Sequence, residues 1–466
     1  MTVSRTSEHQ NIVAPLPPEP PDAPATPALP HSCAPAPAGD VAGTPAEGAA
    51  GTPAEGAAGP PAEGAPGGPA ATAPRRRRVR LVGIDAARGL ALIGMMSVHL
   101  IDPATSDNDV SLAWALSNGT ASALFALLAG VGIAFSTGGR RPPTGRAWRA
   151  GALSLLTRAV IIGAIGLVLG YVVGVTDAAV ILAYYGVLFA LAIPFLRLST
   201  RGLVVAAAAA ALVMPLVSYA ARSAIDPVGA SNPTLTDLVT DPLGLMSRLT
   251  LTGVFPALVW ISYLLAGMAV GRSLLSSRRV AGMIMLLGVA LALASSLLSM
   301  LLLTVGGLGS RLRSDALQTM DFEVYQDTLT WGPSGTTPTN SPWWLVAMAP
   351  HSGSPLDLAF TIGVALAVLG ACLLLGRGLQ PLLLPLAAAG SMTLTLYGAH
   401  LLLVAAPFPG GVLTWVGQVV LVVAFAVVWN RHRLRGPLEE LVWRATDAVR
   451  RKVLGGGEPR RTATGH

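Results

Sequence analysis

Ten apolar stretches follow one another along the chain, and they constrain its fold more than any other feature. A helix of about 20 apolar residues is long enough to cross the hydrocarbon core of a bilayer. The stretches cover residues 84–101, 113–136, 151–172, 178–196, 203–221, 251–271, 280–306, 355–376, 382–405 and 411–430. They predict an all-α fold, a polytopic transmembrane helical bundle of about ten spans.

The composition excludes an ordinary soluble protein. Only 12% of the 466 residues are charged and 52% are hydrophobic, whereas soluble domains carry about 25% charged residues. A net charge of +7 raises the question of a nucleic-acid partner. The arginines lie between the apolar stretches, however, so the lipid bilayer is the expected partner and nucleic acid is not.

Charge differs between alternate loops, and this difference predicts the topology. Arg140 and Arg141 stand in one of the basic loops, whereas Asp107 and Asp109 stand in one of the acidic loops. Because cytoplasmic loops carry an excess of arginine and lysine, both termini are expected in the cytoplasm of a multi-pass protein of the cell membrane. Four arginines fall on the acidic side: Arg222, Arg248, Arg311 and Arg313.

Residues 1–74 form a tail rich in proline, alanine and glycine. The tail contains the octad GTPAEGAA at 43–50 and again at 51–58. A segment with so few large apolar side chains cannot offset the entropy lost on ordering, so disorder is predicted.

The remainder divides into three parts. Residues 75–432 are the predicted polytopic membrane domain, and residues 453–466 a second disordered tail. Between them, residues 433–452 predict an amphipathic helix with Pro437 at its first position. We expect this helix to lie on the cytoplasmic surface of the membrane.

Charged residues inside apolar stretches are candidates for function, because a charge at the bilayer centre costs about 2.5–3.5 kcal/mol on insertion scales. Asp85 and Arg88 open the first stretch, three residues apart on one helical face. They are either a local ion pair or a cytoplasmic anion site. Arg158 either extends its guanidinium to the interface or supplies a second cation for a phosphate or carboxylate.

Three histidines lie outside the tails, and the predicted topology puts all three near the outer face. His99 ends the first stretch, His351 precedes the eighth and His400 lies in the ninth. A neutral imidazole can act as a general base near pH 7. Each can also be a hydrogen-bonded residue at a helix end. Neither HExxH nor CxxC accompanies them, so no metal is expected. Cys33 lies in the polar tail and Cys372 in an apolar stretch, so no disulfide is expected between them.

Other residues in the stretches favour packing. Gly130 and Gly267 are expected to let helices approach closely. Tyr184, Tyr185 and Tyr397 are expected to be packing residues with bonded hydroxyls.

Several segments resemble one known group of membrane proteins. RLVGIDAARGLALIGMMSVHL at 80–100 resembles the opening of the transmembrane acyltransferase superfamily, which includes heparan-alpha-glucosaminide N-acetyltransferase. SMTLTLYGAHLL at 391–402 and RGPLEELVWR at 435–444 resemble the C-terminal signature of its YeiB-like branch, and PALVWISYLLAGMAVGR at 256–272 fits that branch.

The resemblance implies transfer of an acetyl group from cytosolic acetyl-CoA, or another acyl-CoA, to an acceptor across the membrane. Asp85, Arg88 and Arg158 would then hold the donor, and His99, with His400 or His351, would act on a hydroxyl or amine of a glycan or small molecule. A transporter for a small or lipid-linked molecule would use the same groups without chemistry. A structural membrane partner is the third alternative, and a homo-oligomer fits all three.

Overall fold

The computed structural model describes residues 81–107, 109–225, 231–333, 336–433 and 435–455. Residues 1–80 and 456–466, which include all of the first predicted tail and most of the second, lie outside the described residues.

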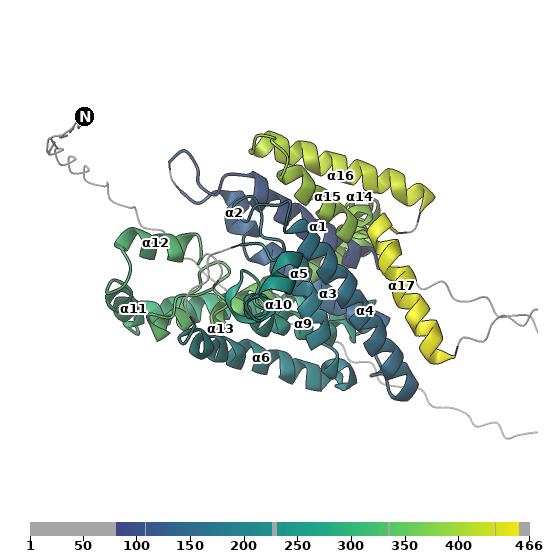
Figure 1. Ribbon diagram of the computed structural model, residues 1–466, viewed down its shortest axis with the longest axis horizontal. Coiled ribbons are helices and arrows are strands. Elements are labelled where there is room, and N and C mark those ends of the chain that lie inside the picture. Colours follow the sequence, from purple (N-terminus) through teal and green to yellow (C-terminus); the bar gives the residue numbers. More distant parts are fainter. Residues whose placement is uncertain (1–80, 108, 226–230, 334–335, 434, 456–466) are drawn as a thin grey trace, which may run out of the picture. The chain divides into compact units, whose positions relative to one another are not determined.

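The described residues form a succession of helices (Figure 1). In chain order they are α1 (Val82–Leu100), α2 (Leu112–Ser117), α3 (Thr120–Ser136), α4 (Gly145–Leu169), α5 (Leu182–Leu191), η1 (Pro194–Arg197), α6 (Thr200–Arg222), α7 (Leu235–Thr240), α8 (Pro242–Ser247), η2 (Arg248–Thr252), α9 (Ala257–Gly271), α10 (Arg278–Leu303), α11 (Leu308–Ala316), α12 (Phe322–Thr330), η3 (Pro342–Val346), α13 (Pro355–Gly378), α14 (Gln380–Gly390), α15 (Thr393–Val404), α16 (Val412–His432) and α17 (Pro437–Leu454). Within the described ranges, strand geometry is limited to one bridge between Ala104 and Val110. The predicted all-α membrane fold class is confirmed.

The number of spans is not confirmed. Among the described residues, six helices are long and apolar enough to cross a membrane, or up to eight if each of two bent pairs counts as one span. Two of the ten predicted stretches fall outside this set. The stretch 84–101 corresponds to α1, whose apolar character is reduced by charged residues in its first two turns. The stretch 178–196 forms only the ten-residue α5 before η1.

The backbone at each bend departs from the helix for a physical reason. The segment Pro242–Thr252 meets α9 at 55°, next to Pro256, which lacks an N–H group and disfavours helix in the residue before it. Helices α14 and α15 meet at 67°. There the backbone of Met392 departs from helical geometry, with φ −136° and ψ 40°. Backbone amides just after it donate hydrogen bonds to a side chain of another helix.

Close helix crossings hold the bundle together. Helix α3 packs along α9, and α10 lies along α13 (Figure 1). At the first crossing, a Cβ added to Gly267 would overlap the backbone carbonyl of Leu127, and one added to Gly130 would overlap that of Leu264. These glycines permit the close approach that the sequence led us to expect.

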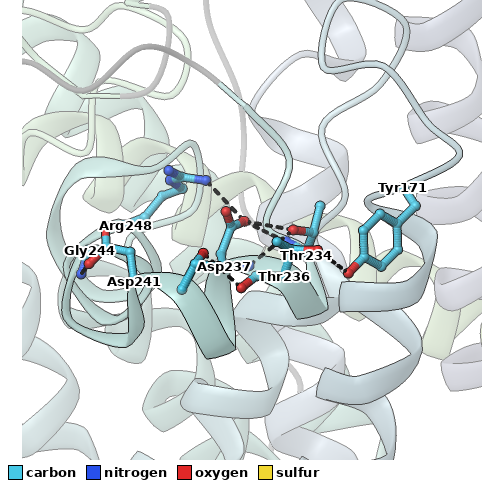
Figure 2. A network of polar contacts seen from close by, with 8 residues as sticks. Tyr171, Thr234, Thr236, Asp237, Asp241, Gly244 and Arg248 are labelled. Atoms are coloured by element: carbon cyan, nitrogen blue, oxygen red, sulfur yellow. Dashed lines mark hydrogen bonds and ion pairs between the residues drawn. The ribbon is translucent and has the colours of Figure 1, made fainter.

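A polar network builds the segment before α9 (Figure 2). Thr234 and Asp237 cap α7 reciprocally, with the Thr234 amide donating to the Asp237 carboxylate at 2.8 Å. Arg248 pairs with the same carboxylate at 3.5 Å. The hydroxyls of Tyr171 and Thr236 lie 2.8 Å apart, which ties α7 to the end of α4.

The other arginines of the acidic loops also have partners in those loops. Arg222 donates to the Thr337 carbonyl at 2.6 Å. Arg311 lies over the Trp343 ring, 5.8 Å from its centroid, and Arg313 lies over a second aromatic ring. Local contacts therefore account for the presence of these four cations.

Replacing Gly267 with alanine is expected to destabilise the bundle. The added methyl group must displace the backbone of α3, and overpacking of this kind costs about 1–3 kcal/mol. Thermal unfolding of the purified protein in detergent measures the change. Gly282→Ala in α10 is the matched control, because no atom lies within 4 Å of the Cβ it would add. Equal unfolding temperatures for the two variants would contradict the close crossing.

Candidate functional site

A cavity of about 650 Å³ lies among α1, α3, α4, α5, α15 and α17. It brings together the three residues that the sequence singled out as cationic or paired with a cation, Asp85, Arg88 and Arg158. These residues come from α1 and α4, so the fold assembles them from separate segments.

Arg88 and Asp85 form the contact expected from their spacing. Arg88 Nη1 lies 3.3 Å from Asp85 Oδ1, and the two side chains are 26% and 10% exposed. On α3, a Cβ added to Gly132 would lie 3.1 Å from the Arg88 guanidinium. The small residue on α3 therefore leaves room for the arginine head at the cavity wall.

Arg158 lies in the cavity with part of its hydrogen-bonding capacity unused. Its guanidinium carbon lies 5.1 Å from the centroid of the Phe189 ring. Its Nε is buried and has no hydrogen-bond partner within the described part of the chain. The Tyr185 hydroxyl, in the same cavity, is also buried and has no partner among the residues that the structure describes. An anionic ligand with hydrogen-bonding oxygens would satisfy both kinds of group.

Helix α17 supplies a wall of this cavity. Arg435, just before the helix, lies over the Trp443 ring at 4.0 Å, and both line the cavity with Arg450. Arg450 also donates to the Ser136 carbonyl at the end of α3, at 3.1 Å. The amphipathic pattern of 433–452 gave no sign of a role in a site.

Glu439 fixes α17 to α15. Its Oε1 accepts from the amides of Leu394 and Thr395 at 2.7 and 3.1 Å, and its Oε2 accepts from the Thr395 hydroxyl at 2.6 Å. These amides belong to the first turn of α15, where a helix leaves N–H groups without intrahelical partners. The carboxylate therefore takes the place of a helix cap.

His99 of α1 and His400 of α15 are far apart in the sequence and lie next to each other in the structure. His99 Nδ1 lies 3.0 Å from His400 Nε2, and the ring planes are within 10° of each other. On the other side of the His400 ring, Nδ1 lies 2.8 Å from Oε1 of Gln418 in α16. His400 is fully buried. The sequence predicted the two histidines but not Gln418, although a lone amide in an apolar stretch was a signal.

His351 lies in the loop before α13 and shares a cavity with His99. It packs against the rings of Phe255 and Trp260, with centroids 5.7 and 6.3 Å away. Burial lowers the pKa of His351 to about 4, so the imidazole is neutral at pH 7. Its φ of 57° is the one positive value of a non-glycine residue in the part described, and its Nδ1 is buried without a partner. Such strained backbone often accompanies function.

Tyr397 lines both cavities. His99 and His351 belong to a cavity of about 40 Å³, which also includes Asn118 and Tyr397. Tyr397 is equally part of the wall of the 650 Å³ cavity. Tyr397 therefore contacts both the arginine-lined cavity and the cavity that contains His99 and His351. Sequence reasoning treated Tyr397 only as a packing residue, because periodicity does not reveal which spaces a side chain separates.

No group of three or more His, Cys, Asp or Glu suited to a metal ion occurs among the residues described. The two cavities are lined by arginines, imidazoles and a tyrosine. Cations can hold an anionic ligand, and a neutral imidazole can accept a proton.

The comparison with protein families agrees with the resemblance seen in the sequence. Residues 80–306 match the family described as heparan-alpha-glucosaminide N-acetyltransferase, catalytic. These residues belong to that family, within the transmembrane acyltransferase superfamily. The match includes Arg88, His99 and Arg158 and ends before His351 and His400. No curated protein matched the chain. Membership of the YeiB-like branch stays a prediction.

Replacing Glu439 with alanine is expected to loosen α17 from α15. The two amides and the hydroxyl lose a charged acceptor, and hydrogen bonds to charged groups contribute about 1.5–3 kcal/mol. Hydrogen exchange should become faster at residues 393–398 and along α17, and the unfolding temperature should fall. Glu440→Ala is the control, because Glu440 pairs with Arg435 and Arg444 near the surface and such pairs contribute little. Unchanged exchange in α15 of the Glu439 variant would refute the anchoring role.

Proposed function

We propose that this protein is a membrane acyltransferase. It moves an acyl group, acetyl in the name of the matched family, from cytosolic acyl-CoA to a hydroxyl or amine acceptor outside the cytoplasm, such as a glycan. One observation carries the proposal: Tyr397 lines both the arginine-lined cavity and the cavity that contains His99 and His351. A donor bound in the first cavity would have its reactive end next to a base in the second.

The cationic groups of the large cavity suit the phosphates of coenzyme A. Arg88 comes from α1 and Arg158 from α4, whereas Arg435 and Arg450 come from the α17 region. Guanidinium groups bind phosphate through paired hydrogen bonds. His99 lies eleven positions after Arg88 in α1, or roughly 16 Å at 1.5 Å per residue. The pantetheine arm of an acyl-CoA can cover that distance.

His99 is the proposed general base. Its Nδ1 faces His400, so its Nε2 is the nitrogen available to an acceptor. As the acceptor oxygen or nitrogen bonds to the thioester carbonyl carbon, Nε2 takes the acceptor proton. The tetrahedral intermediate then collapses, the carbon–sulfur bond breaks, and the departing thiolate receives that proton from the imidazolium.

A transporter for a small or lipid-linked molecule is the alternative function. It would use the same two cavities, but no bond would change. The two functions differ in their products, so an assay that follows both the label and its chemical form separates them.

Arg158→Ala is expected to weaken coenzyme A binding by about 10- to 100-fold, because one charge-assisted contact with a phosphate contributes about 1.5–3 kcal/mol. The affinity is obtained by measuring the unfolding temperature of the purified protein at a series of coenzyme A concentrations. Arg279→Ala, at an exposed position in α10, should bind like the wild type. If coenzyme A protects both variants equally, Arg158 does not hold the donor.

His99→Ala is expected to lower acyl transfer by about 100-fold or more, the usual contribution of a general base, while coenzyme A still binds. Inside-out membrane vesicles loaded with glucosamine receive radiolabelled acetyl-CoA from outside, and labelled N-acetylglucosamine inside is counted. His432→Ala, an exposed histidine at the end of α16, is the control. Full transfer by the His99 variant would exclude the base, and uptake of label without a new product would favour transport.

A further inference from the structure

Gln418 is placed where a membrane helix rarely carries an amide. Most of α16 faces outward, and its buried residues are Gln418, Val422 and Ala426, spaced four apart on one face. Gln418 is 7% exposed. A buried amide in apolar surroundings is costly unless it is hydrogen-bonded. Its contact with His400 therefore accounts for its presence on the face that meets the bundle.

Gln418, His400 and His99 are connected by two hydrogen bonds, and the direction of these bonds determines which ring nitrogen of each histidine carries the proton. The carbonyl oxygen of Gln418 can only accept, so His400 carries its proton on Nδ1. A neutral imidazole has one N–H, which leaves His400 Nε2 as an acceptor. The contact with His99 then requires the proton of His99 on Nδ1. His99 Nε2 is left unprotonated.

The opposite direction would give His99 the opposite chemistry. If Gln418 donated its amide proton to His400, each imidazole would carry its proton on Nε2. His99 would then present an N–H group, which can stabilise an oxyanion but cannot accept a proton. The orientation of one amide in α16 thus decides what His99 can do in α1.

We propose that Gln418 is a positioning residue that holds His400 and His99 in their Nδ1–H tautomers and so leaves His99 Nε2 free to act as a base. The tautomer assignment stands on the contacts alone, whereas its kinetic consequence rests on the proposed function. Gln418 itself touches neither donor nor acceptor in this scheme.

The first experiment reads the tautomers without an activity. In full-length protein labelled with ¹⁵N-histidine, the ring nitrogen spectra distinguish Nδ1–H from Nε2–H, and His99→Gln and His400→Gln spectra assign the signals. We expect Nδ1–H for both residues at pH 7.5. In Gln418→Leu, which has no acceptor, the signals of His400 and His99 should move toward a mixture of tautomers. Nε2–H forms in the wild type would overturn the proposal.

The second experiment uses the transfer assay. Gln418→Leu should lower kcat by about 10- to 100-fold, part of the contribution of a general base, with the KM for acetyl-CoA changed by less than about twofold. Gln418→Glu keeps an acceptor oxygen and should recover most of the lost rate. Thr414→Val is the control: it removes a hydroxyl of the same helix that bonds to the Pro409 carbonyl.

The outcomes separate the two proposals. If the wild type transfers no acyl group but shows Nδ1–H tautomers, the proposed function fails and the tautomer assignment stands. If transfer occurs and Gln418→Leu keeps the wild-type kcat and tautomers, the role of Gln418 is wrong and the acyltransferase function stands. A Gln418→Glu variant no faster than Gln418→Leu, with both folded, also contradicts the positioning role.

Discussion

The carboxylate of Glu439 at the first turn of α15 is the contact on which the site depends. A helix that begins inside a membrane protein leaves amide groups unpaired, and apolar surroundings make this costly. Glu439 accepts from two of these amides and places a negative charge at the positive end of the helix. Helix α15 carries Tyr397 and His400. The same contact therefore fixes the position of Tyr397 beside the two cavities and the position of His400 beside His99. The cytoplasmic surface position expected for 433–452 stays a prediction; the structure adds that residues of α17 line the large cavity.

The two cavities differ in charge, and that difference suits a donor with two unlike ends. Arg88 and Arg158 face the large cavity, whereas His99 and His351 face the small one. A polyanionic nucleotide would bind among the arginines and would not need to go further. Only an uncharged acyl thioester would have to pass Tyr397, so the energetic cost of moving charge through the membrane is avoided.

The sequence predicted what depends on local pattern and missed what depends on assembly. Apolar length predicted the all-α fold. Eight of the ten predicted stretches coincide with the six helices and the two bent pairs that could span a membrane. The spacing of Asp85 and Arg88 predicted their contact. The bend between α14 and α15 could not be predicted, because its stabilising carboxylate lies on α17, more than 40 residues away. Gln418 was missed for a similar reason: its importance arises only when α1, α15 and α16 meet.

The family match covers one of the two paired histidines of this chain. The match ends at residue 306 and contains His99 but neither His400 nor Gln418. An isolated imidazole exchanges its proton between its two nitrogens, so His99 alone has no fixed tautomer. Helices α15 and α16, beyond the matched region, provide the hydrogen bonds that select one form. The base would therefore be completed by a part of the chain that the family match does not include, and residues far from His99 in sequence would decide its reactivity.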